Sequence, residues 1–465
     1  MLRVLSILLS FALFPAGTAF GGVSPLEAEK LDGPELTPLG AERSGNAAGT
    51  IPPWTGGITA PIPGYTPGDH HADPYPQDQV LFAITAANMQ QYDEKLSEGQ
   101  KALLKQYPDS WRMNVYPSRR SAAYPDFVYT ALKTNATVAA VIPAGRGGVR
   151  DTVVTSPFPI PRDGEEVVWN HNLRWRGIHV SRSGGFAPLT RRGNYTLVLL
   201  EEDWASPYAQ PGTHELKTRF PDLLGAFKQK VLAPTFLAGS GRLAVESINY
   251  NDVNRMSWSY SPDLRRVLRS PFAGYDNPSP NTDALRFNDE VDMFNGSPVL
   301  FSWELLGKRE LYIPYNAYQL HSGALTAKDI LQRRHINPDH ARYELHRVWV
   351  VEGTVKVPRR NPNAIRLENR GHLYSRRVFY IDEDTWQIAV ADNYDENGEL
   401  WRFSEGHMIN YYEVPAPWYT LEAFYELKQQ RYLVTGLNNQ RRATRFDEDI
   451  NPRLFGPNAL DYYIR

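Results

Sequence analysis

The sequence predicts an α+β fold that is mostly antiparallel β and forms a barrel-like body. Many segments alternate apolar and polar residues, which is typical of strands with one buried face. Turn residues separate several of these segments at hairpin spacing. Segments with helical periodicity occur early in the chain or between groups of strands. Because helices and strands do not alternate regularly, a doubly wound parallel sheet is disfavoured.

Composition narrows the class of protein. The chain has 465 residues and is 42% hydrophobic, enough for a large core. It holds 50 Lys and Arg against 52 Asp and Glu, so no nucleic acid or anionic membrane partner is indicated. It has no cysteine, which excludes disulfides and Cys-ligated zinc. Aromatic residues reach 12%, a high share useful in sheets, cores and ligand sites alike.

Residues 1–22 have the pattern of a secretory signal peptide. Arg3 precedes an apolar run over residues 4–14, which is too short to span a bilayer. Gly17 and Ala19 fit a small-x-small cleavage site, and we expect maturation near residues 19–22. An uncleaved anchor helix is the alternative. A large exported chain without disulfides is typical of the periplasm of a Gram-negative bacterium, so we expect a soluble periplasmic protein.

The mature chain divides into two predicted parts. Residues 23–80 are rich in Pro, Gly and Asp, which disfavour regular structure and predict an extended arm. Apolar residues within the arm are spaced so that it docks on a body. Residues 81–465 are predicted to form one large β-rich domain.

Four segments carry helical signals, and six carry strand signals. The predicted helices cover residues 86–108, 126–141, 220–232 and 326–334, and Thr326 opens the last with capping-box spacing. The predicted strands lie within residues 165–180, 194–204, 241–252, 256–271, 341–357 and 376–403. Hairpin turns are expected at residues 382–385 and at Asn397-Gly398.

No catalytic motif was found. The chain contains no GxxxxGK[ST], GxSxG or HExxH pattern, and its Gly-rich loop at 144–149 lacks the spacing of a dinucleotide site. The cluster Asp69-His70-His71-Ala72-Asp73 offers metal-ligand types, but without the spacing of known zinc motifs a solvated loop is favoured. The sequence therefore indicates no metal and no cofactor.

Carboxylate groups near two predicted turns each have a functional and a structural interpretation. Asp382, Glu383 and Asp384 have the residue type of a glycosidase acid–base pair, and a sugar-active enzyme is the enzymatic alternative. A turn with solvated charges is the favoured interpretation. Asp392, Asp395, Asn397 and Glu399 resemble half of a calcium loop, but the spacing fits a hairpin turn better.

The aromatic strands raise the question of a ligand cavity. Met256, Trp258 and Tyr260 share one face of a strand, which is either ordinary core or the wall of a cavity. The number of tryptophans in strand-like segments favours a cavity, because a curled sheet leaves such faces lining a hollow. These tryptophans are Trp169, Trp175, Trp258, Trp303, Trp349, Trp386 and Trp401.

Arginines near these strands have two interpretations. Residues 265–269 and the pair Arg376-Arg377 suit phosphate or a lipid headgroup through forked hydrogen bonds. Alternatively they occupy outward strand positions and pair with Glu and Asp of neighbouring strands.

Five long stretches resemble one bacterial family. They cover residues 36–57, 81–104, 258–278, 345–353 and 376–402, and together they resemble the family called domain of unknown function 1329. That family is described as similar to outer-membrane lipoprotein-sorting proteins of the LolA and LolB type. The resemblance implies an open antiparallel β-barrel with helices covering its concave face and acyl chains held inside.

The resemblance implies a function as well. It points to a non-enzymatic periplasmic carrier or chaperone for a lipid or another hydrophobic molecule, with an envelope exporter and an outer-membrane protein as partners. An adaptor or scaffold in an envelope complex is a further alternative. The predicted ligand-binding residues are Trp169, Trp175, Trp258, Tyr260, Trp349, Phe379, Trp386, Arg266, Arg269 and Arg377.

Overall fold

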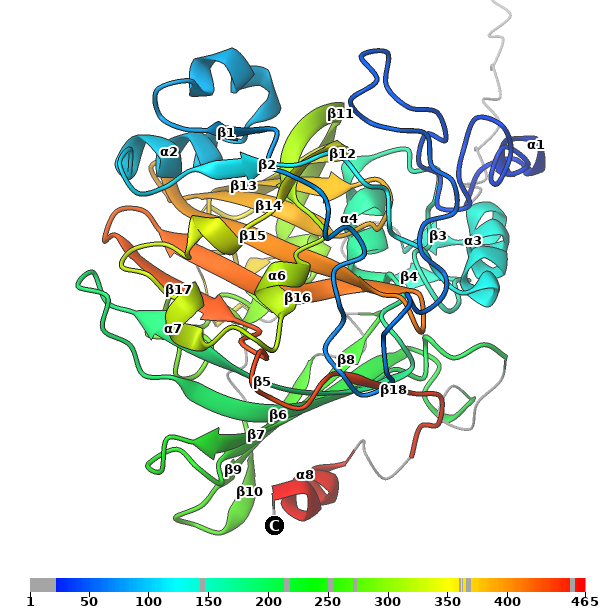
Figure 1. Cartoon of the computed structure of the whole chain (residues 1–465). Helices are drawn as coiled ribbons and strands as arrows, with labels where there is room; N and C mark the ends of the chain where they lie inside the picture. The colour runs from blue at the N-terminus through cyan, green and yellow to red at the C-terminus, as the bar shows by residue number, and fades with distance from the viewer. Residues whose placement is uncertain are drawn as a thin grey trace, which may run out of the picture.

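A 16-stranded sheet forms the body of the protein in the computed structural model (Figure 1). The structure describes residues 22–142, 147–212, 218–249, 255–270, 274–358, 361, 363–364, 369–451 and 456–464. The predicted signal peptide, apart from Gly22, and part of the Gly-rich loop at 144–149 lie outside these ranges. Within them, no helix combines the length and the apolar character needed to cross a bilayer.

The strands follow one another round the sheet in a continuous antiparallel path, and among the described residues only the single bridge between β2 and β12 is parallel. The order is β1 (Phe82–Ile84), β2 (Met113–Val115), β12 (Tyr343–Val355), β13 (Arg376–Asp382), β14 (Ile388–Tyr394), β15 (Leu400–Tyr411), β16 (Ala416–Glu426), β17 (Arg431–Thr435), β5 (His179–Leu189), β6 (Val198–Ala205), β7 (Leu223–Ala233), β8 (Gly241–Ser247), β9 (Met256–Ser261) and β10 (Arg266–Arg269). β11 (Phe301–Pro314) pairs with β12, and β18 (Arg445–Asp447) pairs with β5.

The sheet is curled but open. In the described residues β10 and β1 end the path without pairing with each other, so the strands do not close into a barrel. The β5–β10 half lies opposite the β12–β17 half (Figure 1). The prediction of a mostly antiparallel, open, curled sheet with some helices is confirmed.

Short helices and a two-stranded pair surround the sheet. The helices are α1 (Pro25–Ala28), α2 (Glu98–Gln106), α3 (Asp126–Val138), α4 (Gly164–Leu173), α6 (Tyr318–His321), α7 (Ala327–Ile330) and α8 (Pro457–Ile464), with 3-10 turns η1 (Met89–Lys95), η2 (Asn288–Glu290), η3 (Pro298–Leu300) and η4 (Pro338–His340). β3 (Ala140–Val141) and β4 (Val149–Arg150) form the separate pair.

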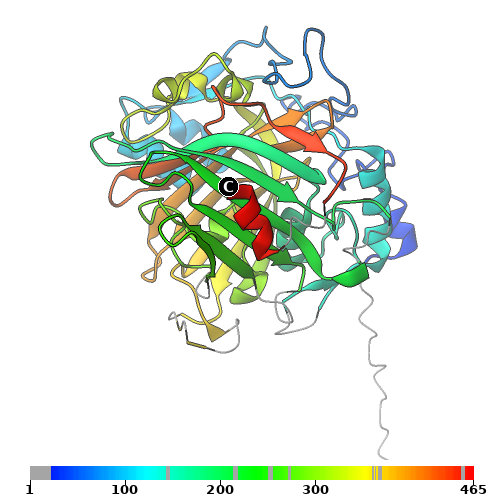
Figure 2. The same ribbon diagram turned by 90° about the horizontal axis from the view of Figure 1, so that it is seen from below.

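The predicted helical cover of the concave face is not confirmed. Helix α8 packs Leu460 and Ile464 against Leu243 and Val245 of β8, on the outer face of the sheet (Figure 2). On the inner face lies the segment 274–295, whose only helical part is the turn η2. We call residues 274–295 the inner segment.

Two predicted elements have the opposite secondary structure. The predicted strand at 165–180 begins as helix α4, which Asp163 caps by accepting a hydrogen bond from Glu166 N. Every residue from Glu166 to Leu173 is buried, so the helix lacks the polar face that reveals its period. The predicted helix at 220–232 is strand β7. A bulge between Leu223 and Gly225 produced the helix-like spacing of its apolar residues.

Other predicted elements are confirmed with adjusted bounds. The long helix expected over 86–108 is divided into η1 and α2 by an extended Leu96, and Ser97 caps α2 in a capping box with Gln100. The capping box of Thr326 and Asp329 opens the single turn α7. Gly398, at φ 77°, forms the expected turn between β14 and β15.

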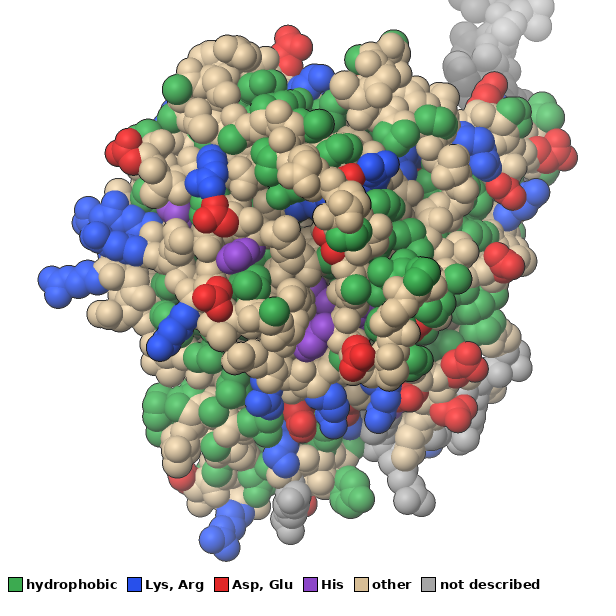
Figure 3. All heavy atoms as spheres, in the orientation of Figure 1, with side chains coloured by type: hydrophobic (Ala, Val, Ile, Leu, Met, Phe, Trp, Pro, Cys, Tyr) green, Lys and Arg blue, Asp and Glu red, His purple; other side chains and the backbone are tan. Residues whose placement is uncertain are grey.

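Residues 22–80 are nearly devoid of regular structure and run along the body. Ile58 N donates to Ser121 O at 2.9 Å, and Asn410 Nδ2 donates to Ile58 O at 2.8 Å. These bonds satisfy backbone groups of a segment that has no strand partner. A domain boundary at residue 80 stays a prediction. Basic and acidic side chains are interspersed over the face seen in Figure 3, in keeping with their nearly equal numbers.

Candidate functional site

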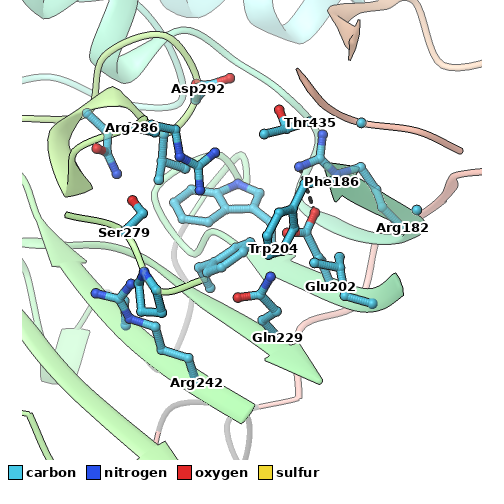
Figure 4. A pocket seen from close by; sticks show the side chains of 18 of the residues that line it. Arg182, Phe186, Glu202, Trp204, Gln229, Arg242, Ser279, Arg286, Asp292 and Thr435 are labelled. Atoms are coloured by element: carbon cyan, nitrogen blue, oxygen red, sulfur yellow. Dashed lines mark hydrogen bonds and ion pairs between the residues drawn. The ribbon is translucent and has the colours of Figure 1, made fainter. Parts of the chain in front are cut away.

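A cavity of about 700 Å³ lies within the curl of the sheet. Its walls are strands β5–β9, the inner segment, and strands β16 and β17 with the residues that follow (Figure 4). Pockets of roughly 300–1,000 Å³ are the usual size for small ligands. The cavity is therefore the candidate binding site.

The strand period explains which side chains face the cavity. On β6, Leu200, Glu202 and Trp204 point inward because successive side chains alternate between faces. On β7, the bulge brings Leu224 onto the same side as Phe227. The apolar part of the lining comprises Phe186, Leu200, Trp204, Leu224, Phe227, Val231, Leu237, Ala244 and Trp418.

Trp204 lies at the centre of the lining. Figure 4 shows its indole between Phe186 and Arg286, with Glu202 on the same strand and Gln229 on the neighbouring strand β7. The guanidinium carbon of Arg176 lies 5.0 Å from its ring centroid. Trp204 thus offers a large apolar face with cationic groups at its margin.

Most charged groups of the lining are paired with each other. Arg182 Nη2 lies 3.1 Å from Glu202 Oε2, as drawn in Figure 4. Arg255 Nη2 lies 2.7 Å from Glu246 Oε1. Arg176 forms an ion pair with Asp292. These pairs neutralise the polar margin of the cavity.

The inner segment is held in place by buried carboxylates. Asp292 Oδ1 accepts hydrogen bonds from Arg174 Nη2 and Trp418 Nε1, each at 2.8 Å. Asp289 Oδ2 accepts one from Arg377 Nη1 at 2.6 Å. Although burial opposes its ionisation, Arg377 and His372 lower the pKa of Asp289 to about 2. The inner wall of the cavity is thus tied to α4, β13 and β16.

Of the ten residues predicted to bind ligand, Tyr260 lines this cavity. Trp258, two positions earlier on β9, pairs with Leu243 and packs in the cluster beneath α8. Arg266 and Arg269 are exposed on the terminal strand β10. The strand-turn-strand over residues 256–269 is present as predicted, but Trp258 packs beneath α8 and does not line the cavity.

The predicted aromatic residues elsewhere belong to packed clusters. Trp169 and Phe379 are fully buried in two different core clusters. Trp175 is buried and its Nε1 donates to Ala209 O at 3.2 Å. The rings of Trp349 and Trp386 are stacked, with centroids 6.0 Å apart. The structure does not bring these residues together, and a ligand role for each stays a prediction.

Arg377 is buried in the protein interior. Its side chain is 1% exposed, because it pairs with Asp289 and donates to Asn393 Oδ1 at 3.0 Å. The neighbouring Arg376 is half-buried and pairs with Glu352 of the adjacent strand at 2.9 Å. Arg376 therefore has the cross-strand partner of the second interpretation, whereas a headgroup role for the buried Arg377 stays a prediction.

The carboxylates at 382–384 are buried, not solvated as the favoured interpretation had them. Asp384 accepts two hydrogen bonds from Arg120, at 2.6 and 2.7 Å. Glu383 accepts from Arg347 at 2.7 Å and from Lys308 at 2.8 Å. These partners hold the two carboxylates as an ion-pair network inside the β13–β14 turn.

One group of side chains has the composition of a metal site. Ligand atoms of His346, Asp382 and Asp384 lie within 4.8 Å of one another, and all three residues are buried. Burial and the neighbouring Asp384 raise the pKa of Asp382 to about 7. Because Arg120 already occupies Asp384, a cation here would have to displace that guanidinium.

The segment Asp69–Asp73 is not a solvated loop throughout. His71 is 2% exposed, and its Nε2 contacts the carboxylate of Glu413. His70 Nε2 lies 3.1 Å from Arg441 O. These contacts dock the arm on the body.

Asp392 belongs to strand β14 and not to a turn. Its carboxylate accepts hydrogen bonds from Ser97 Oγ at 3.1 Å and from Gly99 N at 3.0 Å. It therefore caps the N-terminus of α2 from a distant part of the sequence.

Sequence reasoning missed most of the cavity lining. Arg242 and Arg286, Trp204 and Trp418 were not among the predicted residues. The alternation of Leu200, Glu202 and Trp204 was visible in the predicted strand 194–204 and was the available signal. The inner segment, in contrast, carries no periodic pattern.

Comparison with known proteins identifies the family. Residues 83–461 match the model described as "Protein of unknown function (DUF1329)". The chain belongs to the DUF1329 family. The resemblance noted in the sequence is thereby confirmed.

This DUF1329 chain is also similar to an individual relative and to solved structures. The uncharacterized protein PA3922 of Pseudomonas aeruginosa is 41% identical over 96% of this chain and 95% of that protein. A DUF1329 family protein from Desulfovibrio piger is 13% identical, with a TM-score of 0.40 over 61% of this chain and 92% of the other. A LolA superfamily protein, NE2245 from Nitrosomonas europaea, is 11% identical, with a TM-score of 0.35 over 64% and 98%.

Proposed function

We propose that this DUF1329 protein is a non-enzymatic periplasmic carrier or chaperone that holds a lipid or acyl chain in the cavity between β5–β9 and the inner segment. The observation that carries the proposal is the 700 Å³ cavity with its apolar lining. The signal-peptide pattern supports export to the periplasm. The partners would belong to an envelope transport or export system, such as an exporter and an outer-membrane protein.

The energetics of such a complex are favourable. Burial of one methylene contributes about 0.8 kcal/mol, so about ten methylenes contribute roughly 8 kcal/mol. Ordering the chain and its side-chain contacts opposes this gain. A gain of roughly 8 kcal/mol corresponds by itself to a dissociation constant of about 1 μM, so with these costs subtracted the expected affinity is weaker than micromolar, which suits a carrier that both takes up and releases its ligand.

A sugar-active enzyme is less well supported. Its carboxylates would have to flank an open groove, whereas Glu383 and Asp384 are buried beside Arg120 and Arg347. The adaptor alternative gains no specific observation from the described surface.

Two measurements test the proposal. Native mass spectrometry of protein purified from its own periplasm should show a co-purifying lipid mass. Purified protein should also bind the neutral probe N-phenyl-1-naphthylamine, and added dodecanoate should displace the bound probe. An apo mass together with no uptake of the probe would refute the carrier function.

Variants locate the site. Ala244→Phe narrows the cavity, because Ala244 faces it from β8, and should weaken probe uptake at least fivefold. Tyr462→Ala is the control, since Tyr462 is 89% exposed on α8. If circular dichroism shows that both variants are folded and both take up the probe equally well, the ligand binds outside this cavity.

A further inference from the structure

Arg242 and Arg286 differ from the other arginines that line the cavity. Across the described ranges, no carboxylate lies within ion-pair distance of either side chain, whereas Arg176, Arg182 and Arg255 each have one. The two come from different walls. Arg242 projects from β8 and Arg286 from the inner segment, and Figure 4 shows Ser279 beside them.

The polar partners of these two arginines are few. Arg242 lies 3.3 Å from Ser257 Oγ and 3.3 Å from Asn288 Oδ1, both uncharged acceptors. The Nε of Arg286 is buried and has no hydrogen-bond partner among the described residues. Its guanidinium carbon lies 5.8 Å from the ring centroid of Phe424. Buried guanidinium groups normally have anionic or multiple polar partners, so an acceptor is missing here.

The local electrostatics agree with this geometry. Burial, together with repulsion from Arg255 and Arg286, outweighs the attraction of Glu246 and lowers the pKa of Arg242 to about 10. Burial likewise lowers the pKa of Arg286. Glu422, Glu202 and Glu290 attract Arg286, but each already has other partners. Glu422 accepts hydrogen bonds from Met293 N at 2.8 Å and Thr435 Oγ1 at 2.9 Å. Glu202 pairs with Arg182, and Glu290 accepts one from the Tyr374 hydroxyl at 2.8 Å. An additional negative charge between the two arginines would therefore be stabilised.

We propose that Arg242 and Arg286 form an anion subsite that binds the carboxylate or phosphate headgroup of an amphiphile whose chain lies against Trp204 and Phe227. The inference rests on the proposed carrier function and adds the class of ligand to it. A guanidinium pair matches the planar or tetrahedral oxygens of such a headgroup through charge-assisted hydrogen bonds. A neutral lipid would leave both cations unpaired.

The test compares ligands of equal chain length. Dodecanoate, dodecyl phosphate and 1-dodecanol are titrated at pH 8 against protein loaded with N-phenyl-1-naphthylamine, and inorganic phosphate is titrated alone. We expect both anionic amphiphiles to displace the probe at least tenfold better than the alcohol. Inorganic phosphate alone should not displace it, because the phosphate group without a chain gains no apolar burial.

Variants assign the preference to the two arginines. Arg286→Gln and Arg242→Gln should each reduce the preference for anion over alcohol about tenfold while leaving the affinity for 1-dodecanol within twofold. Arg150→Gln, on the exposed strand β4, is the matched control and should change neither affinity. Thermal unfolding of each variant checks that the fold is retained.

The outcomes separate the two proposals. If dodecanoate and 1-dodecanol bind equally well to the wild type, the anion subsite is wrong and the carrier function stands. The subsite is also wrong if both Gln variants keep the full preference. If no amphiphile binds to the wild type, the carrier function itself is refuted.

Discussion

Leu243 and Trp258 lie directly opposite each other on β8 and β9, and both side chains pack in the cluster formed with Leu460 and Ile464 of α8. The aromatic face of β9 therefore supports a helix on the outside of the sheet. The adjacent position Arg242 faces the cavity. One strand thus separates a packed outer layer from the candidate binding site.

Trp258→Ala should lower stability without weakening ligand binding. Trp258 is only half-buried, so we expect a loss of about 1–2 kcal/mol in the free energy of unfolding. The affinity for dodecanoate should stay within twofold. Urea unfolding and probe displacement measure the two effects. A tenfold loss of affinity with unchanged stability would instead restore Trp258 as a ligand contact.

The exposed arginines of β10 provide a second test of placement. The double substitution Arg266→Gln and Arg269→Gln should leave the affinity for dodecanoate unchanged at 0.15 M salt, because neither side chain faces the cavity. Isothermal titration calorimetry gives the affinity. A marked loss would show that the headgroup is held at the sheet edge.

The contributions of Arg377 and Asp289 to the free energy of unfolding should be coupled, because the two side chains form a buried ion pair. Arg377→Met leaves the Asp289 carboxylate buried without this partner and should cost about 3–5 kcal/mol. Adding Asp289→Asn should recover a substantial part of that loss. A double-mutant cycle by denaturant unfolding gives the coupling energy. Strictly additive losses would contradict direct coupling of the two side chains.

Asp392→Ala should loosen α2 from the sheet. The substitution removes the acceptor of Ser97 Oγ and Gly99 N, and we expect a loss of about 1–3 kcal/mol. Hydrogen exchange of the α2 amides should accelerate before that of β15. Equal acceleration in both elements would mean that Asp392 supports the sheet as a whole.

Glu405→Gln should change how stability depends on pH. Burial raises the pKa of Glu405 to about 8, although Tyr343 donates to its carboxylate at 2.9 Å. The folded protein keeps this proton between about pH 4.5 and 8, whereas the unfolded chain releases it, so wild-type stability falls as pH rises through that range. His407 Nε2 lies 3.9 Å away, too far to donate a hydrogen bond to the carboxylate.

The glutamine side chain of the variant does not ionise, so the variant lacks the part of the pH-dependent fall in stability that Glu405 causes. Wild type and Glu405→Gln should be about equally stable near pH 5. The variant should be more stable near pH 8, by an amount on the order of 4 kcal/mol. Parallel stability curves over the whole pH range would contradict a raised pKa at Glu405.

Local patterns predicted part of the sheet, where strands alternate apolar and polar residues, whereas β11, β16 and β17 lie outside the predicted strands. β8, β9, β12, β13 and β14 all fall within predicted strands. The pattern failed at α4, where both faces are buried, and at β7, where a bulge changes the period. Which face of a strand lines the cavity and which is covered by other elements was harder to predict than the strands themselves. The sequence around Trp258 does not indicate that α8, some two hundred residues later, covers it.

The cavity lining depends on contacts between segments far apart in the chain. Arg242 and Arg286 become neighbours only because the inner segment crosses the curled sheet, held by Asp289 and Asp292. Composition and spacing do not reveal such a crossing. The same reason hides the burial of Glu383 and Asp384, whose cationic partners come from other strands and from the segment before α3.

The anchoring of Asp289 and Asp292 has a consequence for how cargo moves. Withdrawing the inner segment would separate Asp289 and Asp292 from the buried guanidinium groups of Arg174, Arg176 and Arg377, at a cost of several kcal/mol. Bending the margin at β9 and β10 disturbs fewer such pairs among the described residues, chiefly the one between Arg255, which precedes β9, and Glu246 of β8. We therefore expect loading and release to proceed through transient parting of that margin, with the opposite wall acting as a fixed template.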